Sequence, residues 1–524
     1  MSYAKVYSAQ TSLLSPTTIS VEIDLANGLQ AFSIVGLPDK AVEESRDRIS
    51  AAIKNSGLGL KSPKNKNQKV VISLAPADIK KEGPSFDLAI ALSYLLAARD
   101  IFFDPSKKLF LGELSLEGDI RPVKGVLPLV SHARVKGFEE IYVPQENSAE
   151  AALIQGVKIF SVSHLRDVVL HLHEKETIGN DSPKPHQRKI LTPQPRTKIE
   201  RSKFVGDHDF EDIAGQETAK RVLEIAAAGG HNAAMWGPPG TGKTMLAKAF
   251  SSIMPELSFD EMLEVTSIYS VAGLLQEPLI TRPQVRAPHH TSSYVSLVGG
   301  GSIPKPGEIT LAHRGVLFLD EFPEFDRRVV EALRQPLEDR VVSVSRARGS
   351  VLFPAHFILL AAMNPCPCGY YGTNVKACSC SPHHVALYRR KLSGPIIDRI
   401  DLWSHVSHVD HEKLSSKNKH GEKSEIIKRR VEEARERQKF RAKKLGLKKA
   451  SNASLGAKNL LENISLTDKA LLLLNSSAKK LTLSARAYHR VAKVARTIAD
   501  LGGVEKITPE NILEALQYRP KEIG

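Results

Sequence analysis

The sequence lacks any apolar run long enough to cross a lipid bilayer, and its first residues lack the basic-then-apolar layout of a secretory signal peptide. Both absences argue against a membrane-spanning or exported protein, so we expect a cytoplasmic protein with no membrane partner. Cysteine is scarce as well. The 524 residues include 4 cysteines, and all of them fall between Cys366 and Cys380. Disulfides are not expected in a cytoplasmic chain, so this cluster needs another explanation.

Acidic residues are outnumbered by basic ones: 58 Asp and Glu stand against 73 Lys and Arg, which gives a formal net charge of +15. This excess favours a polyanionic partner, nucleic acid before others, although many basic proteins bind no nucleic acid. With 42% hydrophobic and 25% charged residues, the composition is that of a soluble globular protein. Its length has room for roughly three domains.

A glycine-rich loop between an apolar stretch and a helical one is the most informative segment. It fits the Walker A pattern G-x-x-x-x-G-K-[ST] and consists of Gly237, Pro238, Pro239, Gly240, Thr241, Gly242, Lys243 and Thr244. Glycines let backbone N–H groups approach phosphate oxygens, and the helix that follows adds partial positive charge. We predict that Lys243 contacts the β and γ phosphates of ATP and that Thr244 ligates Mg²⁺. A chance glycine loop is the alternative, which the strand before and the helix after disfavour.

Two further apolar stretches have the pattern of buried parallel strands and end in polar residues. Residues 315–319 lead into Asp320 and Glu321, and residues 357–363 lead into Asn364. We predict that Asp320 holds Mg²⁺ through water, that Glu321 polarises the attacking water, and that Asn364 orients water near the γ-phosphate. Taken alone, Asn364 could be an ordinary turn residue, but its position after the other two motifs favours the sensor role.

Residues 1–172 alternate β-rich and helical stretches, which predicts an α/β domain. We expect strands at 20–25, 32–35, 70–74, 141–143 and 157–160, and helices at 40–55, 87–98 and 126–136.

Three further segments complete the predicted organisation. Residues 173–205 are polar and contain four prolines among basic residues, which is typical of a linker. An ATPase core is expected over 206–408 and a helical C-terminal domain over 409–524. Within the core, the glycines and prolines of 265–310 predict a protruding hairpin or loop and not a helix.

Two basic segments could contact DNA. Residues 341–353 alternate like a β-hairpin, and Arg346 and Arg348 lie at its turn. These arginines could contact backbone phosphates, and solvated surface charge is an equally good interpretation. The basic stretch 426–449 is expected to be a solvated helix or one that faces phosphates.

The cysteines form two C-x-C pairs, Cys366 with Cys368 and Cys378 with Cys380. Paired cysteines at this spacing favour a structural Zn²⁺ site over four free thiols, although C-x-x-C is the commoner element. A nearby histidine, His383 or His384, could replace one cysteine ligand.

Two arginines near the end of the core and in the C-terminal region could reach a nucleotide. Arg399 could contact the γ-phosphate bound by a neighbouring subunit, and a local ion pair with Asp398 or Asp401 is the alternative. Arg486 lies near the start of a helix for which Ser484 is a suitable N-cap, and it could touch the nucleotide or remain a solvated charge.

The order of these motifs resembles the ComM/YifB family of magnesium-chelatase-like AAA+ ATPases nearly end to end. The segments that carry the resemblance are Gly-Pro-Pro-Gly-Thr-Gly-Lys-Thr, Arg-Ala-Pro-His-His, Pro-Gly-Glu-Ile, Leu-Phe-Leu-Asp-Glu, Ala-Ala-Met-Asn-Pro-Cys-Pro-Cys-Gly and Ser-Gly-Pro-Ile-Ile-Asp-Arg-Ile-Asp. The resemblance implies a P-loop AAA+ core with a helical lid, assembled as a ring, expected to be a hexamer, with ATP between subunits. It implies Asn364 as sensor 1, Arg399 as the arginine finger and Arg486 as sensor 2. A Lys- and Ser-rich passage at 413–423 departs from the family pattern as an insertion.

The N-terminal motifs at 35–38, 80–88 and 112–122 resemble the Lon-protease-like domain, which is related to the second domain of ribosomal protein S5. Ser85 falls near the place of the Lon nucleophile, but Leu127 occupies the place of the lysine base. Without a base, Ser85 is expected to be an ordinary hydroxyl at a turn or helix start, and proteolysis is disfavoured.

Three functions compete. Family members act as helicases that promote branch migration during integration of transforming DNA. The resemblance therefore implies an ATPase that acts, independently of sequence, on single-stranded or branched DNA. A chelatase motor subunit that drives Mg²⁺ into a porphyrin is the second, and a protein remodeller or relic protease is the third.

Overall fold

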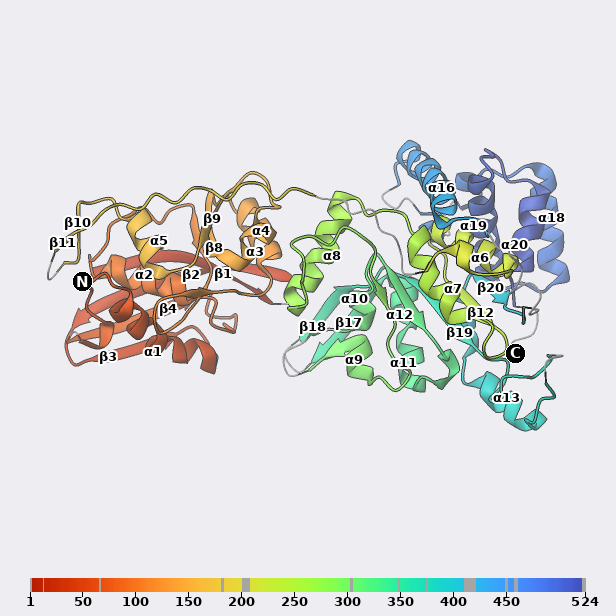
Figure 1. The fold of residues 1–524 in the computed structure, drawn as a ribbon, viewed down its shortest axis with the longest axis horizontal. Coiled ribbons are helices and arrows are strands. Elements are labelled where there is room, and N and C mark those ends of the chain that lie inside the picture. Colours follow the sequence, from red (N-terminus) through yellow and green to blue (C-terminus); the bar gives the residue numbers. More distant parts are fainter. Residues whose placement is uncertain are drawn as a thin grey trace. The chain divides into compact units, whose positions relative to one another are not determined.

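The computed structural model describes residues 2–12, 14–65, 67–180, 183–199, 208–301, 305–346, 349–373, 376–409, 421–447, 451–456 and 460–520. The chain divides into two compact units, and we describe each by itself (Figure 1). The first consists of Met1–Glu200 with Met262–Ile280, and the second of Arg201–Glu261 with Thr281–Gly524. Among the described residues, no helix is both long and apolar enough to span a membrane.

The first unit is built on a mixed seven-stranded sheet with the order β3-β4-β2-β1-β5-β8-β9. Its strands are β1 (Ser2–Ser12), β2 (Ser15–Asn27), β3 (Ala31–Val35), β4 (Gln68–Ala75), β5 (Lys108–Phe110), β8 (Glu140–Pro144) and β9 (Lys158–Val162). A separate two-stranded ribbon joins β6 (Glu113–Leu114) to β7 (Ile120–Arg121). The pairs β1–β2 and β2–β4 are antiparallel, and the remaining pairs of the large sheet are parallel.

Helices cover this sheet, and the α/β class predicted for the region is confirmed. They are α1 (Lys40–Asn55), α2 (Asp87–Ala97), α3 (Val126–Val135), α4 (Ser148–Ala151) and α5 (Leu165–Leu172). In α2 nearly every residue is buried, because the helix packs against β1 and β2. The sequence prediction missed β1, whose eleven residues mix small, charged and aromatic side chains.

A helix from the middle of the chain also belongs to the first unit. Helix α8 (Phe259–Ala272) begins the segment between Walker A and Walker B, and residues 262–280 cluster with the N-terminal residues. The side chain of Glu150 is 5% exposed, accepts a hydrogen bond from the Leu127 N–H at 2.9 Å, and contacts the Ser270 hydroxyl. The expectation that 265–310 contains no helix is therefore wrong, because its glycines and prolines begin only at Gly273.

Two shorter helices also occur within that range, α9 (Tyr294–Val298) and α10 (Glu308–Leu311), beside the small ribbon of β14 (Gly299–Gly300) and β15 (Lys305–Pro306). Residues 302–304 lie outside the described part of the chain.

The segment predicted as a linker runs along the first unit where it is described. Its residues β10 (Thr177–Ile178) and β11 (Lys184–Pro185) pair with each other. Further along, Gln194 donates its backbone N–H to the Ile159 carbonyl at 2.7 Å, and the Thr197 hydroxyl donates to the Ala149 carbonyl at 2.5 Å. Backbone pairing to the unit therefore fixes a polar segment that has few apolar residues of its own.

The second unit is built on a parallel five-stranded sheet with the order β13-β16-β19-β12-β20. Its strands are β12 (Ala233–Trp236), β13 (Val285–Arg286), β16 (Val316–Leu319), β19 (Ile358–Met363) and β20 (Leu402–His405). The helices around it are α6 (Glu217–Gly229), α7 (Lys243–Ala249), α11 (Arg327–Ala332), α12 (Arg334–Asp339), α13 (Pro382–Arg390) and α14 (Gly394–Ile397). In a sheet of this kind, ligands bind at the carboxyl ends of the strands where the strand order reverses.

The predicted hairpin is confirmed as β17 (Val341–Arg346) paired antiparallel with β18 (Gly349–Pro354). Arg346 pairs with Gly349 at the end of the ladder. Residue Arg348 lies outside the described residues.

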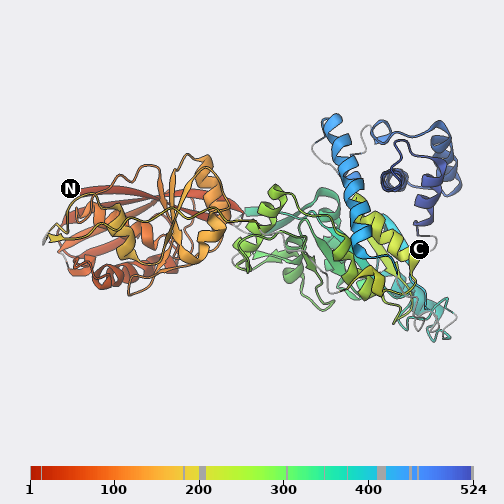
Figure 2. The same cartoon turned by 45° about the horizontal axis from the view of Figure 1, so that its top comes forward.

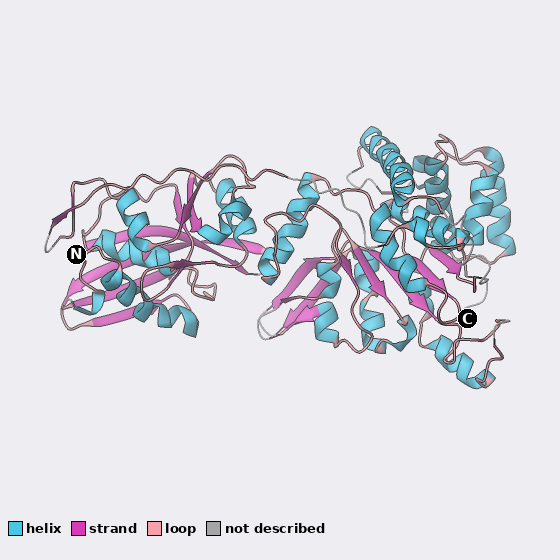
Figure 3. Cartoon of the chain, in the orientation of Figure 1, coloured by secondary structure: helices cyan, strands magenta, loops and turns pink. Residues whose placement is uncertain are grey.

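The described residues from 421 onward form helices and no strand (Figure 3). They are α16 (Ser424–Lys444), α17 (Leu460–Ile464), α18 (Asp468–Lys480), α19 (Ala485–Leu501) and α20 (Pro509–Gln517). Ser484 caps α19 as predicted, since its hydroxyl accepts from the Ala487 N–H at 3.2 Å. Most of the passage at 413–423 lies outside the described residues.

The basic helix α16 is a packing helix as well as a charged one (Figure 2). Arg430 pairs with Glu224 of α6 at 2.6 Å, and Arg435 donates to a backbone carbonyl of α6 at 2.8 Å. Arg441 pairs at 2.7 Å with Asp500 of α19. Several arginines of this helix are therefore already bound within the unit.

Asp500 is the anchor of this helical region. It is 1% exposed and accepts hydrogen bonds from Arg441 at 2.7 Å, Arg496 at 3.1 Å and Asn452 at 2.8 Å. Two guanidinium groups therefore depend on one buried carboxylate.

We expect Asp500→Ala to destabilise this region by about 3–5 kcal/mol, because it leaves the buried Arg496 and the partly exposed Arg441 without their counter-charge. Differential scanning calorimetry should show a clear fall in the Tm of one transition. The matched control is Glu436→Ala, which removes an exposed partner of Lys439 and should leave the Tm unchanged. Equal Tm values for both variants would contradict this account.

Candidate nucleotide site

The Walker A residues form a tight loop between β12 and α7. Gly240 and Gly242 have φ values of 75° and 88°, in the left-handed region that favours glycine. Gly237 is required for a different reason, since a Cβ atom there would lie 2.0 Å from the backbone oxygen of Val406. The loop is therefore held close to the neighbouring strand β20 while its backbone curls.

Lys243 is held inside the loop that it completes. Its Nζ donates to the carbonyl oxygens of Gly237 at 2.8 Å and Pro238 at 2.7 Å, and it lies 3.3 Å from Oδ1 of Asn364. Burial lowers the pKa of Lys243 to about 8, and the charge of Asp320 opposes this shift. The structure thus joins the Walker A lysine to the predicted sensor amide.

Thr244 and the Walker B acid also meet. Thr244 Oγ1 donates to Asp320 Oδ2 at 2.7 Å, and Asp320 Oδ1 accepts from the Glu321 N–H at 2.9 Å. A hydroxyl and a carboxylate at this separation are the groups that hold Mg²⁺ in P-loop enzymes. Glu321 itself has a φ of 52°, so the chain turns sharply at the predicted water-polarising residue.

One contact at this site was not predicted from sequence. His290 Nδ1 lies 3.0 Å from Glu321 Oε2. His290 follows β13, the strand beside β16, and its loop is anchored by the pair Arg286–Glu308, whose two contacts measure 2.6 and 2.8 Å. The Arg-Ala-Pro-His-His segment contributes to the family resemblance, but no role was predicted for His290, because the strand before it, β13, has only two residues and was not predicted.

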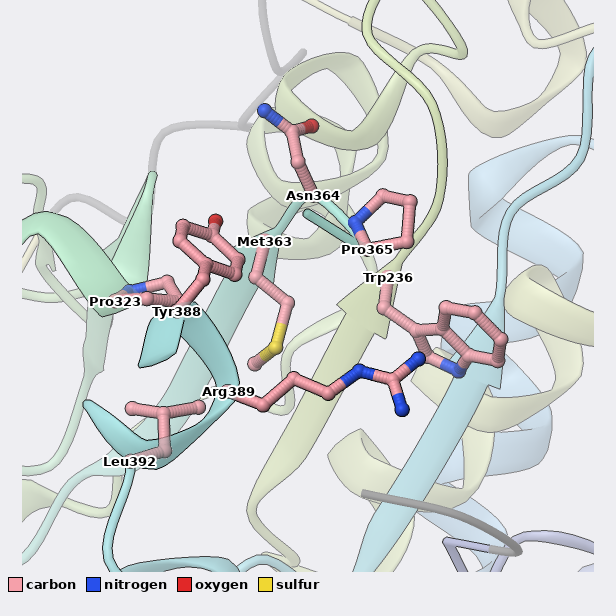
Figure 4. A pocket seen from close by; sticks show the side chains of 8 residues that line it. All are labelled: Trp236, Pro323, Met363, Asn364, Pro365, Tyr388, Arg389 and Leu392. Carbon is pink, nitrogen blue, oxygen red and sulfur yellow. The ribbon is translucent and has the colours of Figure 1, made fainter. Parts of the chain in front are cut away.

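Asn364 lies at the carboxyl end of β19, beside a small pocket (Figure 4). The pocket is lined by Trp236, Pro323, Met363, Asn364, Pro365, Tyr388, Arg389 and Leu392. Its cavity volume of about 40 Å³ is far below the several hundred Å³ of a typical ligand site, so it cannot hold a nucleotide. Burial raises the pKa of the Tyr388 hydroxyl, which receives a hydrogen bond from the Asn364 backbone. Helix α13 therefore supports the sensor position.

The four cysteines come together between β19 and α13. Their sulfur atoms all lie within 4.8 Å of one another, and three of the pairs measure 3.4, 3.5 and 3.7 Å. Four thiolates around Zn²⁺ at 2.3 Å would lie about 3.8 Å apart, so the arrangement fits a tetrahedral ion. The cluster consists of Cys366, Cys368, Cys378 and Cys380, and His383 and His384 are not among its members.

The cysteine element also touches the Walker A loop. A Cβ atom on Gly369, which has a φ of 87°, would lie 2.6 Å from Cδ of Pro239. The Tyr371 N–H donates to Cys366 Sγ at 3.3 Å. A metal that holds the cysteines would therefore brace the Walker A loop from one side.

The predicted arginine finger, Arg399, and the predicted sensor 2 residue, Arg486, share a carboxylate. Arg399 pairs with Glu338, and Arg486 Nη2 donates to Glu338 Oε1 at 2.9 Å. The alternative pairing of Arg399 with Asp398 or Asp401 is not what the structure has, since Arg490 occupies Asp401 at 2.5 Å.

The side chains of the predicted DNA-contact residues are not described: the backbone of Arg346 is, and Arg348 lies outside the described residues. In the first unit, Leu127 is fully buried. The backbone carbonyl of Ser85 accepts a hydrogen bond from the Gly112 N–H at 3.1 Å.

Comparisons with known proteins agree with this geometry. The family described as Magnesium chelatase, subunit ChlI, matches residues 209–414, its C-terminal part matches 421–519, and Subunit ChlI of Mg-chelatase matches 21–147. Competence protein ComM of Haemophilus influenzae is 41% identical over 99% of this chain and 98% of its own length. The chain belongs to the ComM/YifB family of magnesium-chelatase-like AAA+ ATPases. This membership implies ATPase activity with ATP and Mg²⁺.

Two other relatives differ in how much of the chain they match. Uncharacterized protein YifB of Escherichia coli is 40% identical over 99% of this chain and 97% of its own length. The Magnesium-chelatase 67 kDa subunit of Chlorobaculum parvum is 29% identical, but over only 30% of this chain and 23% of its own length. The full-length resemblance is thus to the ComM/YifB proteins.

For this family member we expect Lys243→Ala to lose ATP binding, because the loop then has no cation for the phosphates. Glu321→Gln should bind ATP normally and lower kcat by about a hundredfold or more, since it removes a charge needed in the transition state. Nucleotide binding by calorimetry and phosphate release separate the two effects. A Glu321→Gln protein with the wild-type kcat would refute the Walker B assignment.

For the cysteines we expect close to one zinc per chain by elemental analysis. Cys378→Ser with Cys380→Ser should remove the metal, lower the Tm and weaken ATP binding, because metal binding is coupled to local folding and the element packs on Pro239. His383→Ala with His384→Ala is the matched control and should retain the zinc. Metal-free protein with four reactive thiols and an unchanged Tm would exclude the site.

Proposed function

We propose that this protein is an ATP-dependent ring motor that acts on DNA and migrates DNA branches during recombination or natural transformation. The observation that carries the proposal is the full-length similarity to Competence protein ComM, which extends through every ATPase motif. A DNA substrate of this kind places the activity in the cytoplasm.

The described contacts support a working ATPase. Lys243 donates to the Gly237 carbonyl of its own loop at 2.8 Å, and Thr244 donates to Asp320 at the end of β16 at 2.7 Å. We assign Lys243 to the phosphates, Thr244 and Asp320 to Mg²⁺, and Glu321 to the attacking water. Asn364 serves as sensor 1, beside the lysine.

A ring explains why two arginines lie apart from the Walker A contacts. In AAA+ motors an arginine supplied by a neighbouring subunit stabilises the charge on the transferred phosphate. We assign Arg399 to that role and Arg486 to sensor 2, in a hexamer with ATP between subunits. Residues 409–524 are the helical lid of this core, residues 173–205 join it to the N-terminal domain, and residues 1–172 are a Lon-protease-like domain that has no protease role.

DNA is the substrate that the charge favours. The net charge is +15, and several arginines of α16 are engaged in packing. This leaves the β17–β18 hairpin as the better candidate for phosphate contacts that ignore base sequence. The zinc that we propose for the cysteines has a structural role and stands outside the reaction.

A chelatase motor subunit is the alternative with support of its own, because the family descriptions name magnesium chelatase. The Magnesium-chelatase 67 kDa subunit matches 30% of this chain, however, against 99% for ComM. The hypothesis of a protein remodeller or relic protease has less support. Ser85 is the one sequence feature that suggests it, and Leu127 stands where the resemblance would require a lysine base.

ATPase rates with and without DNA, together with gel shifts on branched, single-stranded and duplex DNA, test the proposal. We expect branched or single-stranded DNA to bind and to raise kcat. Absence of both binding and stimulation would reject a DNA motor in favour of the alternatives.

We expect Arg346→Ala with Arg348→Ala to weaken DNA binding by about tenfold or more. The salt dependence of binding should also fall, because a protein that makes fewer phosphate contacts releases fewer counterions when it binds. DNA-stimulated hydrolysis should fall while the DNA-free rate stays unchanged. Fluorescence anisotropy at several salt concentrations measures the affinity and the slope.

The matched control removes two exposed charges from the end of α16, Lys443→Gln with Lys444→Gln. It should bind DNA like the wild type. If this control loses DNA and the hairpin variant keeps it, the hairpin is not the contact.

A further inference from the structure

Glu338 joins two residues that are far apart in the sequence and are assigned related tasks. Its Oε1 accepts from Arg486 Nη2 at 2.9 Å, and its Oε2 contacts Arg399 Nη2. One carboxylate thus binds the guanidinium of the arginine finger and that of sensor 2. Both side chains are forks that recognise phosphate oxygens in the same manner as carboxylate oxygens.

Arg399 is covered in this arrangement. The residue is 9% exposed, and its Nη1 donates to the Pro395 carbonyl at 2.8 Å. Among the described residues, its buried Nε has no hydrogen-bond partner. A finger must present its guanidinium to a phosphate on another subunit, so Arg399 has to leave Glu338 before it can act.

The charges around Glu338 strengthen the hold. Partial burial works against its ionisation, but the hydrogen bond and charge of Arg399, with the charges of Arg486 and Arg490, keep the pKa of Glu338 below its ordinary value. The carboxylate is therefore ionised at neutral pH and competes with a phosphate for both guanidinium groups.

Glu338 is also fastened to the hairpin. It lies in the last turn of α12, and one residue, Arg340, separates that helix from β17. Gln335 of α12 accepts from the Ser343 N–H of β17 at 3.3 Å, and the Arg340 carbonyl accepts from the Ala355 N–H, just past β18, at 2.8 Å. A displacement of the hairpin base therefore moves the carboxylate.

We propose that Glu338 is a positioning residue that holds Arg399 and Arg486 away from the nucleotides that they serve and releases them when the β17–β18 hairpin engages DNA. This inference rests on the proposed function, because it takes the hairpin as the DNA contact. It assigns to one carboxylate the coupling between DNA binding and hydrolysis.

The test is Glu338→Gln in the full-length protein, which keeps the shape of the side chain and removes its charge. A neutral amide binds guanidinium groups more weakly than a carboxylate, so the DNA-free kcat should rise by about threefold or more. KM for ATP should change little, and the further stimulation by DNA should shrink by a similar factor. Glu338→Asp keeps the charge and should retain the low DNA-free rate.

Two further variants separate positioning from a structural effect. Glu331→Gln removes a carboxylate that pairs with Arg334 at 2.5 Å on the preceding helix, and it should leave both rates unchanged. Adding Arg399→Ala to Glu338→Gln should abolish the gain in kcat, because the gain acts through the released finger. A gain that survives Arg399→Ala would overturn the proposal.

The outcomes for DNA and for Glu338 are distinguishable. If DNA fails to stimulate the wild type, the proposed function fails, and a raised DNA-free kcat in Glu338→Gln still supports the hold on the arginines. If DNA stimulates the wild type while Glu338→Gln has an unchanged or lowered DNA-free kcat and an unaltered Tm, the DNA motor stands and the role of Glu338 is refuted.

Discussion

The register of the parallel sheet in the second unit is the constraint on which the nucleotide site depends. Trp236 pairs with Met363, so the Walker A loop and Asn364 begin at the same level of the sheet. Leu319 pairs with Ala361, which places Asp320 beside the carboxyl end of β19, where it accepts a hydrogen bond from Thr244 of α7. Because a strand alternates its faces, a slip of one residue would turn these polar groups away from each other. Strands β16 and β19 are buried along their whole length, so their apolar pattern alone does not distinguish one register from another.

The same physics explains what the sequence could predict. Strands β12, β16 and β19 are short apolar runs. The Walker A loop follows β12, and the predicted site residues Asp320 and Asn364 follow β16 and β19 directly, so element and site residue are visible in one stretch. Hairpin β17–β18 alternates clearly, and Ser484 is a recognisable N-cap. The contacts of Glu338 with Arg399 and Arg486, and that of His290 with Glu321, were not predictable, because ion pairs between distant residues leave no periodic pattern in either segment.

Helix α8 and the polar segment at 183–199 show a different limit. Residues 265–310 are rich in glycine and proline, yet these residues begin at Gly273, and the eight residues before it continue a helix with buried apolar positions. The tie of Ser270 to Glu150 assigns that helix to the first unit, and backbone hydrogen bonds do the same for 183–199. The average composition of these two segments does not predict where they pack, because contacts with residues distant in the sequence decide it.

The second unit holds its cations in two unequal ways, and the difference separates ATP binding from hydrolysis. Lys243 is held by neutral carbonyl oxygens and an amide, which are weaker partners for an ammonium group than a phosphate is. Arg399 and Arg486 are held by the charged Glu338, which matches a phosphate in charge type and fork geometry. On the roles proposed above, a phosphate of ATP competes more easily for the lysine than for the arginines, because the partners of the lysine carry no charge. Only interactions gained in the transition state accelerate the chemical step. On this proposal, an arginine that is released only when DNA binds controls the rate of ATP hydrolysis and not the binding of ATP.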